Sequence, residues 1–247
     1  MKELTLIGIG TGNPDHLTRA GEAAIREAEL ILIPRKGSEK SDLADLRRTI
    51  CASVLGPEAD DRVLAFDLPV RDASGDYRQG VDSWHDAIAL AWSKALETRA
   101  ASRVALLVWG DPSLYDSSLR IAGRLSPMPK IAVVPGITAL QALTAAHAIP
   151  LNAINALVVI TTGRRLRDDG WPEAASTVAV MLDGECSFTH LDPKGLDIWW
   201  GAFLGMENQI LLKGPLASMT DQIVRTRQDA RARHGWIMDT YLLKRRD

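Results

Sequence analysis

The chain has 247 residues, of which 46% are hydrophobic and 24% charged, and its formal net charge at pH 7 is −2. This composition excludes a disordered or collagen-like protein, and the near-neutral charge gives no general attraction to nucleic acid. The two cysteines, Cys51 and Cys186, lie far apart in the sequence, so neither a disulfide framework nor a paired-cysteine zinc site is expected.

The first 150 residues alternate short apolar runs, typical of strands, with helical patterns. Strands are predicted over residues 4–9, 30–33, 63–66, 104–109 and 131–134, and Pro34 is expected to end the second of them. Helices are predicted over residues 19–29, from about 41, from a cap at Ser83, and over 113–124 and 138–148. Because parallel strands need long crossover connections, this alternation predicts a mainly parallel, doubly wound sheet with helices on both faces.

The pattern changes beyond Pro150. Strands are predicted over residues 157–161, 177–181, 198–204, 210–212 and 236–243, with one long helix over 216–233. The smaller number of helices between these strands predicts a partly antiparallel, mixed sheet. The predicted fold class is therefore α/β with two α/β domains, residues 1–137 with the doubly wound sheet and residues 138–247 with the mixed sheet.

Tryptophan is unusually frequent, with seven residues against three Tyr and three Phe. Trp84 and Trp92 lie on a predicted helix whose apolar residues recur every four positions, which places both rings in the core. Trp109 ends a predicted strand, whereas Trp199 and Trp200 are neighbours on another and must face opposite ways.

Three predicted strand ends of the first domain contain glycine, at residues 8–12, 110–112 and 135–136. Since ligands of open parallel sheets bind beyond the carboxyl ends of the strands, these loops are expected to lie on one edge of the sheet. Glycine lets a ligand approach the backbone, and the helices that follow offer free amide donors. Together the loops favour a small-molecule site.

Taken singly, two of these loops have a simpler explanation as helix starts. Asp111 before Pro112 has the form of an N-cap followed by proline at the first helical position. Thr138 and Gln141 have the spacing of a capping box.

The first loop also resembles a dinucleotide-binding fingerprint, but its glycines have a different spacing. Arg35 and Lys36 stand where the acidic ribose-binding residue is expected, and such cations suit the extra phosphate of NADP. An NADP-dependent oxidoreductase acting on a tetrapyrrole or similar small molecule is therefore one alternative function, and a non-catalytic α/β binding protein is another.

Other kinds of site find no support. The five histidines have no metal-type spacing, so no metal is expected, and no nucleophile-elbow or phosphate-loop motif occurs. The N-terminal apolar stretch is too short and too acidic for a signal peptide, and no apolar run approaches the roughly 18 residues of a membrane span. A cytoplasmic protein that binds neither nucleic acid nor membrane is expected.

At the three loops the sequence resembles the tetrapyrrole methylases, the S-adenosylmethionine-dependent family that builds the corrin ring. The matching segments are LIGIGTGNPDHLTRAGEAAI, VALLVWGDPSLYDS and VVPGITALQALTAAHAIPL, in the order of the family, with residues 177–181 as a later match. The resemblance covers essentially the whole chain. It implies two α/β domains with a cofactor cleft between them, and a homodimer.

The resemblance also implies a cofactor, S-adenosyl-L-methionine, with S-adenosyl-L-homocysteine as the product. The cofactor contacts of the family fall on Thr11, Gly110, Asp111, Leu114, Thr138, Ala139 and Met181. In the second domain, where the match is thinner, they fall on Ala202, Leu204 and Ile237. The first loop of the family usually has proline at the position of Thr11.

Within the family, segments such as FDLPVRDA and LDIWWGAFLGMENQILLKGPL are most similar to members that methylate carbon 1 of precorrin-5 and release acetate. Another regiospecificity within the family is the alternative. The candidate catalytic residues are Asp111, which would position the methionyl end of the cofactor, and Tyr115 and Glu207, which are candidate bases for acetyl loss.

The implied substrate, precorrin-5, carries many carboxylates, so a cationic rim is expected. Arg35 and Lys36 are the preferred anchor, because they follow the second strand on the same edge as the glycine loops. A second cationic group follows a later strand and comprises Arg164, Arg165 and Arg167.

Flat apolar rings suit a flat macrocycle, which gives the tryptophans a second expected use. Trp109 and one of Trp199 and Trp200, with Trp200 preferred, are expected to border the tetrapyrrole.

Overall fold

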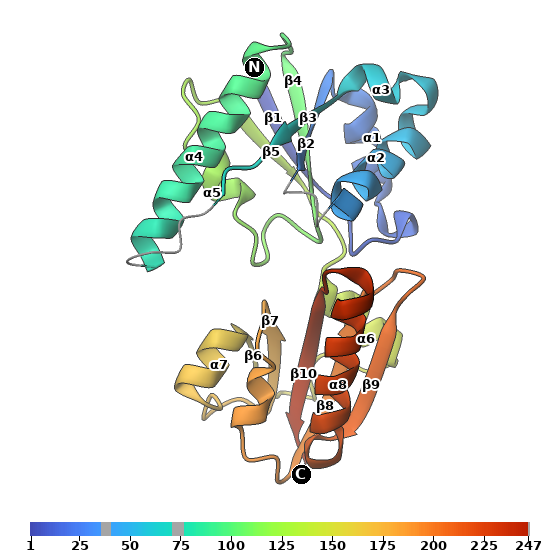
Figure 1. Cartoon of the computed structure of the whole chain (residues 1–247), viewed down its shortest axis with the longest axis vertical. Coiled ribbons are helices and arrows are strands. Elements are labelled where there is room, and N and C mark those ends of the chain that lie inside the picture. The colour runs from blue at the N-terminus through green and yellow to red at the C-terminus, as the bar shows by residue number, and fades with distance from the viewer. Residues whose placement is uncertain (36–40, 71–76, 247) are drawn as a thin grey trace. The chain divides into compact units, whose positions relative to one another are not determined.

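The computed structural model describes residues 1–35, 41–70 and 77–246. The chain divides into two compact units, which we call unit 1 (Met1–Ile137) and unit 2 (Thr138–Asp247). Each unit has a five-stranded sheet of its own (Figure 1). Among the described residues, no helix combines the length and the apolar character that crossing a membrane requires.

The strands of unit 1 are β1 (Glu3–Gly8), β2 (Leu30–Arg35), β3 (Val63–Asp67), β4 (Arg103–Val108) and β5 (Lys130–Val134). They form one parallel sheet in the order β3-β2-β4-β1-β5. After β1 the chain crosses the sheet in one direction to form β2. After β4, the neighbour of β1, it crosses in the opposite direction to form β5. Such a change of direction is where open parallel sheets bind their ligands.

Helices cover both faces of this sheet, as predicted (Figure 1). One face carries α1 (Arg19–Glu27), α2 (Ser41–Leu55) and the short α3 (Ala59–Arg62), and the other carries α4 (Tyr77–Glu97) and α5 (Ser118–Ala122). Short 3-10 helices lie at Pro14–His16 and Gly56–Glu58. Strand alternation supplies both cores: Leu4 and Leu6 of β1 pack with Trp92 of α4, whereas Ile7 packs with Ile25 of α1.

Two predicted helix starts in unit 1 are wrong. The helix predicted to start after a cap at Ser83 is α4, which begins at Tyr77, so Ser83 lies inside the helix and does not cap it. The helix predicted over residues 113–124 is only α5, which begins at Ser118, because the chain after Asp111 is held in a loop by its own hydrogen bonds.

Pro34 lies inside β2, where it pairs with Phe66 of β3, so the expectation that it ends the strand is also wrong. On its other side the ladder between β2 and β4 stops at Leu32. Proline has no N–H to donate there, and the Nε of Arg47 in α2 donates instead to Leu107 O of β4 at 2.9 Å. A side chain thus replaces one backbone hydrogen bond of the sheet.

The strands of unit 2 are β6 (Val158–Thr162), β7 (Thr177–Met181), β8 (Leu196–Ala202), β9 (Ile210–Pro215) and β10 (Asp239–Arg245). Their order is β6-β7-β10-β8-β9. The pair β6–β7 is parallel and the other pairs are antiparallel, which confirms the predicted mixed sheet.

The helices of unit 2 are α6 (Ala139–His147), α7 (Gly163–Asp169) and α8 (Leu216–His234), with a 3-10 helix at Ser187–His190. A Cβ at Gly201 of β8 would lie 2.8 Å from Leu143 of α6. The neighbouring Trp200 shares its hydrogen-bond acceptor, Asp239, with Arg227 of α8. Because adjacent strand residues face opposite ways, α6 and α8 cover opposite faces of this sheet.

Candidate functional site

Unit 1 brings its three glycine loops into backbone contact at the carboxyl edge of the sheet. A Cβ at Gly8 would lie 2.6 Å from Gly136 N and 2.8 Å from Gly110 O, and a Cβ at Gly136 would overlap the same Gly110 oxygen. Gly10 and Gly110 form an isolated bridge, in which Gly110 N donates to Gly10 O at 2.7 Å. The prediction that these loops share one edge is confirmed.

Asp111 joins two of these loops. Its Oδ2 accepts a hydrogen bond from Gly136 N at 2.8 Å, and its Oδ1 accepts one from Ser113 N at 2.8 Å and one from the Ser113 hydroxyl. Burial raises the pKa of this carboxyl, but the hydrogen bonds from Ser113 and Gly136 outweigh burial and leave the pKa below its ordinary value. Asp111 is not a helix cap, because the N-cap of α5 is Ser117.

The backbone at the end of β4 has unfilled space beside it, although Gly110 itself is buried. Gly110 has a φ of +68°, and no described atom lies within 4 Å of the position that its Cβ would occupy. A ligand can therefore approach this backbone closely. Three candidate site residues lie in the chain around Gly110. Trp109 and Leu114 are half-buried, and Tyr115 is exposed. Thr11, in the first loop, is buried, with its hydroxyl 3.1 Å from Nδ1 of His16.

The strand register of unit 2 gathers four expected cofactor contacts at one edge of its sheet. Met181 ends β7 and Ala202 ends β8, and β10 runs between them with Asp239 opposite Ala202. Leu204 follows β8 and Ile237 precedes β10 at this same edge. Ala202 and Leu204 are buried, whereas Met181 and Ile237 are half-buried.

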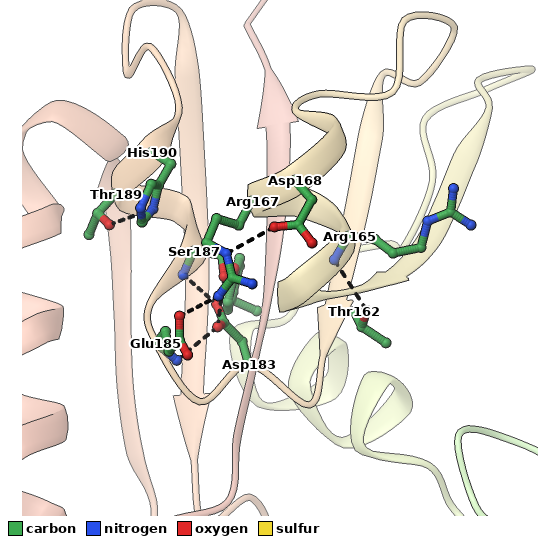
Figure 2. Close-up of polar contacts among 10 residues, drawn as sticks. Thr162, Arg165, Arg167, Asp168, Asp183, Glu185, Ser187, Thr189 and His190 are labelled. Carbon is green, nitrogen blue, oxygen red and sulfur yellow. Dashed lines mark hydrogen bonds and ion pairs between the residues drawn. The ribbon is translucent and has the colours of Figure 1, made fainter. Parts of the chain in front are cut away.

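A buried polar cluster lies at this edge of unit 2, and the sequence interpretation missed it. Asp183, just after β7, accepts hydrogen bonds from the Tyr241 hydroxyl at 2.7 Å and from Ser187 N and Oγ at 2.6 and 2.9 Å. Figure 2 shows Asp183 and Ser187 facing each other in the loop that they share. Gly163 must be glycine, because a Cβ there would overlap the Asp183 carboxyl group.

A buried ion pair adjoins this cluster. Arg227 Nε donates to Asp239 Oδ2 at 3.0 Å, and Arg227 Nη2 donates to Asp183 O at 3.1 Å. Trp200 Nε1 donates to the same Asp239 oxygen at 3.0 Å. Burial raises the pKa of Asp239 in spite of the opposing effect of Arg227. The three side chains hold the start of β10, the end of β8 and the loop after β7 together.

The position of Trp200 gives no support to its expected place beside the tetrapyrrole. Its side chain is 0% exposed and its Nε1 is bonded to Asp239, so the structure does not favour Trp200 over Trp199. Trp199 faces the opposite side of the sheet and is half-buried, with Lys244 Nζ 5.4 Å from its ring centroid. Trp92 is buried in the core as predicted, and Trp84 packs against that core.

The preferred cationic anchor is already engaged within unit 1. The guanidinium of Arg35 forms a fork with the carboxylate of Asp67, at 3.0 Å from Nε and 3.2 Å from Nη2. A substrate carboxylate would have to compete with this ion pair. Lys36, the other half of the expected anchor, lies outside the described residues.

Two of the three arginines of α7, Arg165 and Arg167, are also paired with carboxylates. Figure 2 shows Arg167 directed toward Asp168 and Glu185. Arg165 forms an ion pair with Asp169 at 2.9 Å, one helical turn away. These arginines are therefore neutralised within unit 2.

The remaining expected residues lie in unit 2. Thr138 caps α6, since its Oγ1 accepts from Gln141 N at 3.3 Å and Gln141 Oε1 accepts from Thr138 N at 2.8 Å, which confirms the predicted capping box. Ala139 is the first residue of α6 and is half-buried. Glu207 is exposed in the turn between β8 and β9.

Comparisons with known proteins agree with this arrangement. Residues 3–220 match the family described as Tetrapyrrole (Corrin/Porphyrin) Methylases. The chain is 44% identical over 252 aligned positions to a "Precorrin-6A synthase [deacetylating]" from Sinorhizobium sp., covering 99% of this chain and 96% of that protein.

Two solved structures are also similar. A putative cobalamin synthesis related protein from Corynebacterium diphtheriae matches with a TM-score of 0.84 and 37% identity, covering 100% of both chains. A uroporphyrin-III C-methyl transferase from Thermus thermophilus, complexed with S-adenosylhomocysteine, matches with a TM-score of 0.57 and 16% identity, covering 98% of this chain and 97% of that one. The second likeness concerns the fold alone.

Proposed function

Because the chain belongs to the tetrapyrrole (corrin/porphyrin) methylase family, we propose that it is an S-adenosylmethionine-dependent C-methyltransferase of cobalamin biosynthesis. The proposed reaction methylates carbon 1 of precorrin-5 and, with one water, releases the extruded acetyl group as acetate to give precorrin-6A. The observation that carries this proposal is the 44% identity, over 99% of the chain, to a protein named for this synthesis.

The residues at the two sheet edges fit the proposed cofactor. In unit 1, the unfilled space beside Gly110 can accept close approach of a ligand, with Thr11, Asp111 and Leu114 in the same or adjoining loops. In unit 2, the proposed contacts are Thr138, Ala139, Met181, Ala202, Leu204 and Ile237, which are mainly apolar as an adenosine group requires. When bound, S-adenosylmethionine supplies an electrophilic sulfonium methyl group.

The protein's part in methyl transfer is to position the reactants. The backbone contacts among Gly8, Gly110 and Gly136 fix the loops, and Asp111 holds two of these loops together by hydrogen bonds at 2.8 Å. Asp111 thus acts on the cofactor through the loop geometry that it maintains. Alignment of two reactants can supply about 7–11 kcal/mol in favourable systems, so no covalent intermediate with the protein is needed.

Acetate release is a separate chemical step. Water adds to the acetyl carbonyl, and the carbon–carbon bond to the ring then breaks, with the electron pair passing into the conjugated ring. A base within about 3 Å of the water must take its proton. Tyr115, exposed in the loop after β4, and Glu207, exposed in unit 2, are our candidates for this base.

The two candidates can be separated by measuring turnover and binding. We expect the variant that removes the base, Tyr115→Phe or Glu207→Gln, to lower kcat for acetate release and to leave the KM for precorrin-5 close to the wild-type value. A raised KM with an unchanged kcat would assign the residue to binding instead.

We also propose that the chain acts as a homodimer, as the family resemblance implies. Sedimentation equilibrium of the purified protein tests this, with a mass near twice the 26.9 kDa of one chain expected. A concentration-independent mass of one chain would contradict it.

The test of the proposed function is to incubate the protein with precorrin-5 and S-adenosylmethionine and to quantify methylated product and acetate. Stoichiometric amounts of the two products are expected. Methylation without acetate would assign the chain a different regiospecificity within its family. No methylation of any precorrin would overturn the proposal.

Calorimetry separates the proposed function from an NADP-dependent oxidoreductase. S-adenosylhomocysteine is expected to bind and NADP is not, because the first loop departs from the dinucleotide fingerprint and Arg35 is paired with Asp67. Binding of NADP alone would favour the oxidoreductase.

A further inference from the structure

Arg47, in the middle of α2, is a cation that the sequence interpretation did not single out. Its Nε donates to Leu107 O at 2.9 Å, and its Nη1 donates to Leu43 O at 3.0 Å. Two bonds to backbone oxygens fix the plane of the guanidinium. The group lies near the carboxyl end of β4, because Leu107 precedes the last residue of that strand.

Strand geometry explains why this position is available. Val108 O accepts from the N–H of Ile9 at 2.9 Å, and Ile9 directly follows Gly8, the residue of β1 that is in register with Val108. Because successive carbonyls of a strand point to opposite sides, Leu107 O faces β2. Continued by one residue, the register of β2 and β4 pairs Leu107 with Ile33, so the N–H that should donate to Leu107 O belongs to the next residue, Pro34. Proline has no N–H, so Arg47 makes the bond that the strand cannot.

A neutral side chain could make that bond, which leaves the charge of Arg47 to be explained. Among the described residues, no carboxylate lies within ion-pair distance of it, and Nη2 has no acceptor. Burial lowers the pKa of Arg47 to about 10, an effect that Asp116 opposes, so the group remains a cation at neutral pH. A cation that is largely removed from water and has no ion-pair partner among the described residues is unfavourable, and a ligand carboxylate would supply that partner.

The position of Arg47 suits a ligand of the glycine edge. The cofactor loops follow β1, β4 and β5, and Arg47 lies on the other side of β4, toward β2. The residue is half-buried, so part of its surface remains accessible. Arg35 at the end of β2 differs, because its fork is occupied by Asp67.

We propose that Arg47 binds a carboxylate of the tetrapyrrole substrate, as an anchor next to the cofactor loops. This inference rests on the proposed function. A guanidinium has five N–H donors, of which two are used, and the remaining Nη1 and Nη2 hydrogens can hold a carboxylate by two parallel bonds. The substrate would then be anchored by a residue of α2 that is itself bonded to β4, the strand whose loop carries the proposed cofactor contacts Gly110 and Asp111.

The test uses two ligands and a matched control. Binding of uroporphyrin, a stable tetrapyrrole polycarboxylate, is measured by fluorescence, and binding of S-adenosylhomocysteine by calorimetry. Arg47→Gln removes the charge but keeps an N–H donor. The control is Arg103→Gln, since Arg103 Nε also donates to a backbone oxygen, Glu27 O at 3.0 Å, but at the amino end of the same strand β4.

We expect R47Q to weaken uroporphyrin binding about tenfold to hundredfold and to leave the affinity for S-adenosylhomocysteine within about threefold. R103Q should change neither. In the methylation assay, R47Q should raise the KM for precorrin-5 more than it lowers kcat. A folded R47Q protein that binds uroporphyrin as tightly as the wild type would overturn the proposal.

A second variant separates the charge from the hydrogen bond. In P34A/R47Q, alanine restores the missing backbone N–H opposite Leu107 O, so the sheet no longer needs the arginine and the variant should fold. Weak uroporphyrin binding by this variant supports the anchor, and wild-type binding assigns Arg47 to the hydrogen bond alone.

Wild-type protein decides between the two proposals. If it binds uroporphyrin but methylates no precorrin, the proposed function fails, and the comparison of R47Q with the wild type still decides the role of Arg47. If it binds no tetrapyrrole carboxylate, both proposals fail.

Discussion

The contacts among Gly8, Gly110 and Gly136 join three loops of unit 1 through backbone atoms alone. Side-chain flexibility cannot relieve a clash between such atoms. The sequence pattern predicted that the loops share one edge, because each follows a strand of a parallel sheet. It did not predict how closely they meet, since a closest approach depends on three strands that are far apart in the chain.

We predict that Gly136→Ala displaces these loops. Its Cβ would overlap Gly110 O, and such overpacking costs about 1–3 kcal/mol of unfolding free energy. Affinity for S-adenosylhomocysteine should fall as well, because the backbone at Gly110 moves. Urea denaturation and calorimetry measure the two effects.

The control for this variant is Gly123→Ala, where the nearest atoms to the new Cβ lie at 3.6 and 3.7 Å, ordinary contact distances. It should change stability by less than about 0.5 kcal/mol. If G136A binds S-adenosylhomocysteine as the wild type does, the glycine edge is not the cofactor site.

His85 of α4 is a buried titratable residue that unit 1 does not use in its site. Its side chain is 3% exposed, and neither ring nitrogen has a hydrogen-bond partner among the described residues. Burial, with Arg124 and Arg120 nearby, holds the pKa of this imidazole below 6.5. The unfolded chain therefore takes up a proton at a higher pH than the native protein does.

We predict that His85→Leu stabilises the protein, by about 1–3 kcal/mol, because it removes two buried polar atoms without partners. The sign of the pH effect follows from the lowered pKa: wild-type stability is lost as the pH falls below about 6.5. The gain in Tm should therefore be larger at pH 5.5 than at pH 8. His190→Leu, at an exposed position, is the control. A gain independent of pH would contradict the titration of His85.

At the scale of elements, α8 contributes Arg227 to a buried contact with β8 and β10. The side chains of Arg227 and Asp239 are 11% and 7% exposed. An ion pair desolvated to this degree makes a protein sensitive to the loss of one partner, because the other charge then stays buried without compensation.

We predict that Arg227→Met costs about 3–5 kcal/mol of unfolding free energy at pH 7. Burial already raises the pKa of Asp239, and loss of Arg227 removes the main effect that opposes burial. Asp239 then takes up a proton on folding, so the deficit of the variant relative to wild type should shrink as the pH falls from 7 to 5. R227M/D239N should lose less stability than R227M. Equal losses in the single and double variants would show that packing of the long side chain, rather than charge, dominates.

Most elements were predictable because their apolar runs are short and bounded by polar residues, as the agreement for β3, β5 and β7 shows. The exceptions have local causes. The sequence from Gly163 to Asp169 is mostly charged and lacks the apolar face of a helix, so α7 was not predicted. Pro34 stays inside a strand because a side chain distant in sequence replaces its missing donor.

The polar residues of the candidate site were less predictable than the glycine loops. Asp183 and Arg227 are ordinary charged residues in the sequence, and their partners lie on other elements. Arg47 likewise is one of two adjacent arginines on a helix. Pairing across the fold decides which charges are neutralised, and spacing along the chain does not report it.

At the scale of the whole molecule, ligand binding should stabilise the native chain. At a free concentration of about 100 times its Kd, S-adenosylhomocysteine should add about 2.7 kcal/mol, since it binds only the native state. For a chain of this size we expect Tm to rise by about 5–10 °C in differential scanning calorimetry. NADP at the same concentration serves as the control, and an equal rise with NADP would argue against a dedicated cofactor site.

The two sheets differ in when their strands are synthesised. In unit 1 the last strand, β5, lies at the edge of the sheet, so the four earlier strands can pair before it is made. In unit 2 the last strand, β10, is the central one and joins the pair β6–β7 to the pair β8–β9. During translation, unit 1 can therefore fold progressively on the ribosome. The sheet of unit 2 cannot be completed until β10, which ends at Arg245, has emerged and joined the two strand pairs.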